Sequence, residues 1–270
     1  MHEKRLYIHI GCHKTGTTTI QRTLFENNKA LGSHGVRYFC RNYFTAENVP
    51  PHLHSWLRFK EGPDTFEEGM SLRDPEKLAR ELDQLNSDVV ISSENFSFIF
   101  EGQELNKLRE ELATYFSNMK IICYIRRQDE HLVSHHQEGS KLNRRPEYAL
   151  FRHSPCALPE YNARHRLYLD YHQRLSMWGD AFGDENMVIR VFEKEKLEKH
   201  DLIEDFFALI GIDSYERVDR SNESMGFKKT KLGHILNNSE VVNKSQIADL
   251  LISRLGSSDK MLPSRNRASE

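Results

Sequence analysis

The stretch from Arg5 to Asn28, RLYIHIGCHKTGTTTIQRTLFENN, constrains the fold of this chain more than any other. It opens with an alternating apolar run at residues 6–10, which predicts a buried strand. Small residues follow, and apolar residues then return at helical spacing from Ile20 onwards. A strand, a short glycine-containing loop and a helix direct several backbone N–H groups towards one point. The stretch therefore predicts a binding site for a phosphate-like anion.

The spacing within this loop differs at one position from that of an ATP-binding loop. In the pattern G-x-x-x-x-G-K-[ST], Gly11 and Gly16 occupy the two glycine positions and Thr18 the hydroxyl position. Thr17 stands where the lysine is expected, and Lys14 is the lysine of this loop. A lysine before the second glycine must approach the anion from another side. The loop therefore suits a phosphate-like group, but not the β- and γ-phosphates of ATP held in the usual way.

The segment from His13 to Thr18 resembles the 5′-phosphosulfate loop, P-K-[ST]-G-T-T, of sulfotransferases that use 3′-phosphoadenosine 5′-phosphosulfate (PAPS). His13 replaces the family's usual proline, and Thr19 replaces the aromatic residue that often follows the threonines. The resemblance implies a catalytic role for Lys14 and a co-substrate site made by His13, Lys14, Thr15, Gly16, Thr17 and Thr18. A tight turn that binds nothing is the alternative that this loop alone leaves open.

A second part of the family's signature follows the apolar strand predicted at residues 120–125. Arg126 comes directly after that strand, and Ser134 stands eight residues later on a predicted helix. An arginine forks onto a phosphate, and a serine about two helical turns along can reach the same group. The resemblance implies that Arg126 and Ser134 bind the 3′-phosphate; a surface ion pair is the alternative for the arginine. The run RRQD, with no proline, is what we expect of bacterial, carbohydrate-directed branches of the family.

A third candidate is Glu94, which follows the buried apolar run at residues 88–93. In an open parallel sheet, ligands lie at the carboxyl ends of the strands, so Ser93, Glu94 and Asn95 are candidates for the site. We expect Glu94 to be the general base that accepts a proton from the acceptor. A helix-capping or solvated carboxylate is the alternative, and the base would then be sought among His52, His54 and His136.

Two histidines raise the possibility of a metal site. His131 and His135 form an i, i+4 pair on one helical face, a spacing that can bind zinc. No third ligand is evident nearby in the sequence, and an exposed helical face is the alternative. The sequence therefore predicts no metal site.

Charge and apolar patterning exclude several functional classes. Lys and Arg number 38 against 40 Asp and Glu, a formal net charge of −2, so we expect no nucleic-acid partner. No apolar stretch approaches the length of a membrane span, and the polar N-terminus lacks the apolar core of a signal peptide. The four cysteines show no paired metal-ligand spacing and suit a reducing compartment. We expect a cytoplasmic protein; the sequence does not indicate its oligomeric state.

Strands and helices alternate along the chain, which predicts an α/β fold of three layers, α/β/α, with a central, mainly parallel sheet. The family resemblance extends from about Arg5 to Ser224 and implies a P-loop NTPase-like sulfotransferase fold. We expect a single domain over residues 1–270, with 41–73 and 141–160 as substrate or lid loops. The spacing also predicts a helix over 74–85, capped by Asp74 with Pro75 at its first position, and one long helix over 161–182.

Together these features predict a sulfotransferase that moves a sulfuryl group from PAPS to a hydroxyl or amine acceptor. Adenosine 3′,5′-bisphosphate (PAP) would be the product, and no metal is required. The resemblance implies a carbohydrate as the first candidate acceptor, with a small phenol or an amine behind it. A P-loop kinase of small metabolites is one alternative, which the missing lysine after Gly16 disfavours. A nucleotide-binding module without turnover is the other, and an inert Glu94 would be its sign.

Overall fold

The computed structural model describes residues 3–40, 52–60, 69–141, 159, 161, 163–218 and 227–255. It divides into two compact units: residues 1–126 with 170–220 form the first, and residues 127–169 with 221–270 form the second. The expected substrate loops at 41–73 and 141–160 fall largely outside the described residues. Their role, and the single domain over residues 1–270, stay predictions.

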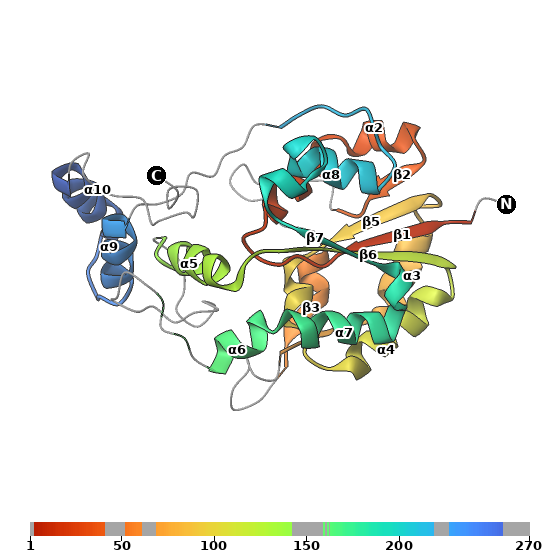
Figure 1. The fold of residues 1–270 in the computed structure, drawn as a ribbon, viewed down its shortest axis with the longest axis horizontal. Helices are drawn as coiled ribbons and strands as arrows, with labels where there is room; N and C mark the ends of the chain where they lie inside the picture. Colours follow the sequence, from red (N-terminus) through yellow and green to blue (C-terminus); the bar gives the residue numbers. More distant parts are fainter. Residues whose placement is uncertain are drawn as a thin grey trace. The chain divides into compact units, whose positions relative to one another are not determined.

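A five-stranded parallel sheet forms the centre of the first unit (Figure 1). In order across the sheet, its strands are β2 (Val36–Tyr38), β5 (Asp88–Ser92), β1 (Arg5–His9), β6 (Asn118–Ile125) and β7 (Met187–Val191). The central strand β1 pairs Ile8 with Ile91 of β5 on one side and with Ile121 of β6 on the other. These three residues are fully buried, as expected for a parallel sheet covered on both faces.

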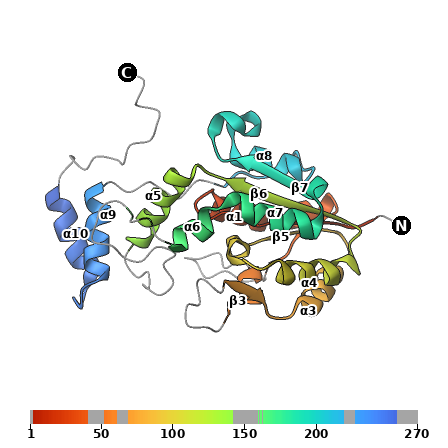
Figure 2. The same cartoon turned by 60° about the horizontal axis from the view of Figure 1, so that its bottom comes forward.

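Helices form a layer on each face of this sheet. One layer contains α1 (Thr17–Glu26), α2 (Asn28–Ser33) and α8 (Leu202–Leu209); the other contains α3 (Pro75–Asp83), α4 (Gly102–Ala113) and α7 (Tyr171–Phe182). Figure 2 shows α8 on one side of the sheet, and α3 and α4 on the other. The three layers and the parallel sheet confirm the predicted α/β fold.

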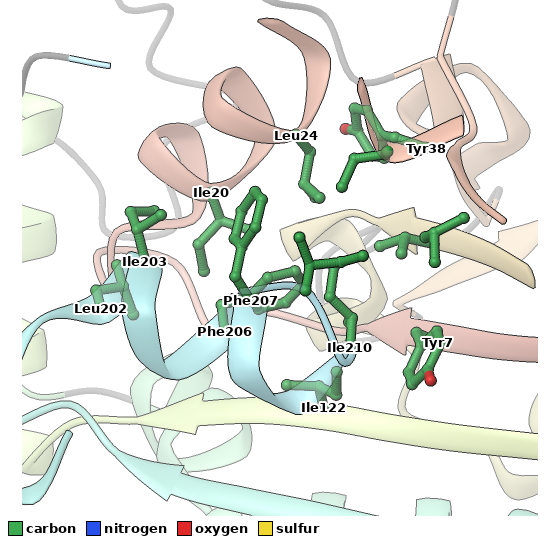
Figure 3. Packing of buried hydrophobic residues seen from close by; sticks show 14 of the residues in the cluster. Tyr7, Ile20, Leu24, Tyr38, Ile122, Leu202, Ile203, Phe206, Phe207 and Ile210 are labelled. Atoms are coloured by element: carbon green, nitrogen blue, oxygen red, sulfur yellow. The ribbon is translucent and has the colours of Figure 1, made fainter. Parts of the chain in front are cut away.

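The apolar core between the sheet and the first layer fixes the position of α1 (Figure 3). Ile20 and Leu24 of α1 belong to the same buried cluster as Phe206 and Phe207 of α8 and Ile122 of β6. Full burial of each such side chain contributes roughly 1.5–3 kcal/mol. Because α1 begins directly after the predicted anion-binding loop, this core also holds one end of that loop in place.

Two helix predictions had different outcomes. The helix with Asp74 as its N-cap is confirmed, since Lys77 N donates to Asp74 Oδ1 at 2.9 Å. The single long helix over 161–182 is wrong, because the chain forms α6 (Ala163–Leu169) and α7, which starts at Tyr171. Asp170 has a non-helical backbone and caps α7 by accepting a hydrogen bond from Gln173 N at 2.9 Å. The apolar spacing continues across this break and does not mark it.

Short elements add to the first unit. The described part of the predicted loop at 41–73 contains the 3₁₀ turn η1 (His52–Trp56) and an antiparallel pair, β3 (Leu57–Phe59) and β4 (Met70–Leu72). Other 3₁₀ turns are η2 (Glu94–Phe98), η4 (Asp184–Asn186), η5 (Lys194–Lys196) and η6 (Glu198–His200). Of these, η2 places a predicted site residue at the end of β5.

The second unit is helical and contains α5 (Gln128–Gly139), α6, α9 (Phe227–Asn237) and α10 (Lys244–Leu255). Helix α9 approaches α5 closely at Gly233, where a Cβ atom would lie 2.0 Å from the backbone oxygen of Ser140. Next to it, His234 stacks on His136 with ring centroids 4.0 Å apart. Among the described residues of both units, no helix is long and apolar enough to cross a membrane.

Candidate functional site

The loop predicted to bind an anion joins β1 to α1 and has an unusual backbone. Gly11, Lys14 and Gly16 have φ angles of +83°, +62° and +81°. Glycine adopts such angles readily, whereas a lysine does so at a cost and only where its surroundings hold it. In an anion-binding nest, left-handed residues next to right-handed ones turn successive N–H groups to a common side, and the positive φ angles of this loop fit such a geometry. The backbone of this loop therefore fits a phosphate-like group.

Internal hydrogen bonds hold the loop, and they involve two of its threonines but not the exposed one. The hydroxyls of Thr15 and Thr17 both donate to the carbonyl oxygen of Cys12, at 2.7 and 3.1 Å. Both side chains are buried, whereas Thr18 is exposed and Lys14 is half-buried. Thr15 and Thr17 thus shape the loop with their side chains, and Lys14, Thr18 and the backbone N–H groups are the parts that can face an anion.

Beneath the loop, a buried cationic side chain contacts a thiol. Arg174 of α7 is only 4% exposed, and its Nη2 donates to Cys12 Sγ at 3.6 Å. The hydrogen bond with Cys123 and the charge of Arg174 outweigh burial and lower the pKa of Cys12 to about 6. The same hydrogen bond and burial raise the pKa of Cys123, so Cys12 is the thiol that ionises.

The structure brings Glu94 against this loop. Glu94 is the first residue of η2, and a Cβ atom on Gly11 would lie 2.9 Å from its Cα. Its carboxylate is half-buried, and Oε2 accepts a hydrogen bond from Gln21 Nε2 of α1 at 3.0 Å. Ser93, not Glu94, caps η2 by accepting from Asn95 N at 3.2 Å. Glu94 is therefore a carboxylate beside the loop and not a helix cap.

The two residues predicted to hold a 3′-phosphate lie on the elements that the sequence indicates. Arg126 follows β6 directly, belongs to the first unit and is half-buried. Ser134 lies on α5 in the second unit and is also half-buried. Their joint action on one phosphate stays a prediction. His13 packs its ring on Phe98 of η2, with centroids 5.0 Å apart.

The three histidines considered as alternative bases are on η1 and α5. His52 and His54 belong to η1, but their side chains are outside the described residues. His136 is buried in the second unit, stacked on His234. His131 and His135 are buried on α5 with ring centroids 6.4 Å apart, and the described part of the chain contains no group of three or more ligating side chains arranged for a metal ion.

The first unit also contains a cavity of about 630 Å³ that the sequence motifs did not predict. Its lining includes Thr19 of α1 and the charged residues Lys194, Lys199, Asp201 and Arg217. Arg217 pairs with Glu204 at 2.9 Å, and this hydrogen bond, together with that of Lys199, lowers the pKa of Glu204 to about 2. The sequence did contain a signal for this cavity. Lys194 follows the carboxyl end of β7, and ligands of parallel sheets lie at that end of the strands.

Comparison with known proteins identifies the family. The protein-family model described as "Sulfotransferase domain" matches residues 7–260, so the chain belongs to the sulfotransferase domain family. An uncharacterized protein of Archaeoglobus fulgidus is 30% identical over 130 residues, 47% of this chain and 31% of that protein. The chain thus matches about a third of the length of this relative. A crystal structure of a sulfotransferase from Alicyclobacillus acidocaldarius is similar with a TM-score of 0.48 and 15% identity, covering 91% of this chain and 100% of that one.

Proposed function

We propose that this chain transfers a sulfuryl group from PAPS to a hydroxyl or amine, with a carbohydrate as the first candidate acceptor. One observation carries the proposal: an anion-binding loop with Lys14 at positive φ lies directly against the carboxylate-bearing residue Glu94. Membership of the sulfotransferase domain family supports the reaction class. The resemblance of residues 13–18 to the phosphosulfate loop supports the choice of donor.

On the donor side, the loop and α1 hold the 5′-phosphosulfate. Backbone N–H groups of residues 15–18 and the hydroxyl of Thr18 bind its oxygens, and Lys14 offsets the negative charge that develops on the bridging oxygen as the S–O bond breaks. Arg126 and Ser134 bind the 3′-phosphate. The cavity beside Thr19 is of a size that suits the nucleoside, since ligand pockets span roughly 300–1,000 Å³.

On the acceptor side, Glu94 removes the proton of the attacking hydroxyl or amine. The acceptor oxygen or nitrogen forms the new bond to sulfur, the bond from sulfur to the bridging oxygen breaks, and PAP departs. The proton ends on Glu94, so protons and charges balance without a metal. General-base assistance of this kind contributes roughly 10²–10⁴ in rate.

The thiols of the chain support a location in a reducing compartment. Cys12, Cys40 and Cys123 are free cysteines in the described part of the chain. Cysteines that stay reduced are the rule in cytosolic proteins. We therefore propose a cytoplasmic location.

The structure gives a specific argument against a kinase. Thr17, which stands at the position of the ATP-binding lysine, donates its hydroxyl to Cys12 O and helps to hold the loop. An ATP-binding loop needs a lysine there to reach the β- and γ-phosphates. A module that binds the nucleotide without turnover is the other alternative, and activity of the wild-type chain decides against it.

Nucleotide preference tests the proposed donor. PAP at 100 times its Kd should stabilise the chain by about 2.7 kcal/mol, measured as a rise in melting temperature. ATP with magnesium should have little effect at the same concentration, and adenosine 5′-monophosphate controls for the adenosine and the 5′-phosphate. Equal shifts for PAP and ATP, or a larger one for ATP, would contradict the proposed donor and favour a kinase.

A further inference from the structure

We infer that Gln21 is a positioning residue, which fixes the orientation of the Glu94 carboxylate through a chain of hydrogen bonds that continues into the core to Ser92 and His9. The inference rests on the proposed function, because it explains how Gln21 orients Glu94, the proposed general base. Gln21 does not touch the reacting atoms in this assignment; it acts through Glu94.

The contacts of Gln21 are those of a side chain with a fixed orientation. Gln21 is 2% exposed, and its Nε2 donates to Glu94 Oε2 at 3.0 Å and to Ser92 Oγ at 3.2 Å. A glutamine amide carries two N–H donors, so these two acceptors use both. A hydrogen bond to one carboxylate oxygen fixes the rotation of the carboxylate, and with it the direction of the other oxygen. Bonds to a charged acceptor are the stronger class.

The chain continues into the core and ends on a neutral group. Ser92 Oγ lies 2.8 Å from Nδ1 of His9, which is on the central strand β1 and is fully buried. The ring of His9 packs edge-on against Phe206 and Tyr124. Burial lowers its pKa to about 4, although the charge of Glu94 opposes this, so His9 is uncharged at neutral pH. The chain of hydrogen bonds that starts at Glu94 therefore ends on a neutral imidazole.

The same helix serves the donor and the base. The first turn of α1 follows the anion-binding loop, and Gln21 lies one turn further along, with its side chain on Glu94. The apolar core around Ile20 and Leu24 holds this helix rigidly. A shift of α1 would move the donor site and the base together. A misplacement of about 1 Å at a reacting group can cost about 10²-fold in rate.

Gln21→Met tests the inference, because methionine has a similar length and shape but no donor. We expect kcat to fall about 10- to 100-fold with the KM for the nucleotide almost unchanged. Because Gln21 acts through Glu94, the substitution should cause no further loss in a Glu94→Gln background. Thr23→Val is the matched control, since it removes a buried hydroxyl of the same helix that donates to Thr19 O at 2.9 Å. It should keep kcat within about twofold of the wild type.

A second readout needs no turnover. In chain labelled with ¹⁵N-glutamine, the side-chain amide signal of Gln21, assigned by its loss in Gln21→Met, should shift in Glu94→Gln and not in Thr23→Val. A Gln21 amide signal that does not shift in Glu94→Gln overturns the inference. An equal loss of kcat from Gln21→Met in the wild-type and the Glu94→Gln backgrounds overturns it as well. Normal turnover of Glu94→Gln overturns the base assignment and the inference together. A failure of PAP to bind contradicts the proposed function alone, and the amide signal then still decides whether Gln21 holds Glu94.

Discussion

The buried histidine His9 should make the stability of the first unit depend on pH. Burial lowers the pKa of His9 to about 4 in the folded chain, against 6.5 for an ordinary histidine. Between these two values the unfolded chain binds a proton that the folded chain does not, so stability falls as the pH falls. The contribution of neutral His9 to the free energy of unfolding is intact above pH 6.5 and is lost as the pH drops to 4. The gap between the two pKa values corresponds to about 3 kcal/mol.

His9→Asn tests this contribution, because the asparagine amide is uncharged at every pH. The substitution will destabilise the chain at pH 7 by disturbing a packed site, so the informative quantity is the difference between the two proteins. The free energy of unfolding of the wild type, minus that of His9→Asn, should shrink by about 3 kcal/mol between pH 7 and pH 4. Carboxylates and other histidines titrate in both proteins and cancel in this difference.

Urea unfolding followed by tryptophan fluorescence is the suitable assay. The chain has two tryptophans, Trp56 and Trp178, and both are buried in the first unit, which contains His9. His34→Asn, at an exposed position after α2, is the control and should keep the pH dependence of the wild type. A difference between wild type and His9→Asn that stays constant from pH 7 to pH 4 would refute the reasoning.

Three further substitutions test the proposed site. Lys14→Ala should lower turnover about 10²–10³-fold while PAP affinity changes little, because Lys14 acts on charge that develops in the transition state; a loss confined to affinity would show an anchoring role only. Arg126→Ala should weaken PAP by about 1.5–3 kcal/mol in a calorimetric titration and leave adenosine 5′-monophosphate unaffected; equal weakening of both nucleotides would make Arg126 structural. Glu94→Gln should bind PAP normally and lose about 10²–10⁴ in turnover, and a destabilised but active variant would remove Glu94 from the mechanism.

Local sequence signals predicted the elements that carry the site. The glycines at 11 and 16 and the apolar run before them indicated a strand, a loop and a helix, and the structure has all three. Asp74 and Pro75 marked the start of α3 because capping and the first-turn preference for proline are local effects. Glu94 was placed at the site by a rule of topology, that ligands lie at the carboxyl ends of parallel strands.

What the sequence did not predict depends on contacts between distant residues. Gln21 and Glu94 are 73 positions apart, and no periodicity links them. Arg174 and Cys12 are 162 positions apart in the sequence. The position of Arg174 beneath the loop therefore follows only from the packing of α7 on the sheet. The break at Asp170 was missed because the apolar spacing is the same in α6 and α7. An N-cap residue inside a periodic run was the available signal.

A formal net charge of −2 is compatible with the proposed anion site, because this site does not depend on an excess of basic residues. The proposed donors are mainly backbone N–H groups, and the positive φ angles of Gly11, Lys14 and Gly16 fit a loop that turns such groups to one side. The buried cation beneath the loop, Arg174, donates a hydrogen bond to Cys12, and its charge helps to lower the pKa of that thiol. Backbone geometry is therefore a main feature of the proposed site. At Gly16 a side chain would also collide with Leu202, since a Cβ atom there would lie 2.2 Å from its Cδ2, so the packing of α8 and the shape of the loop are fixed together.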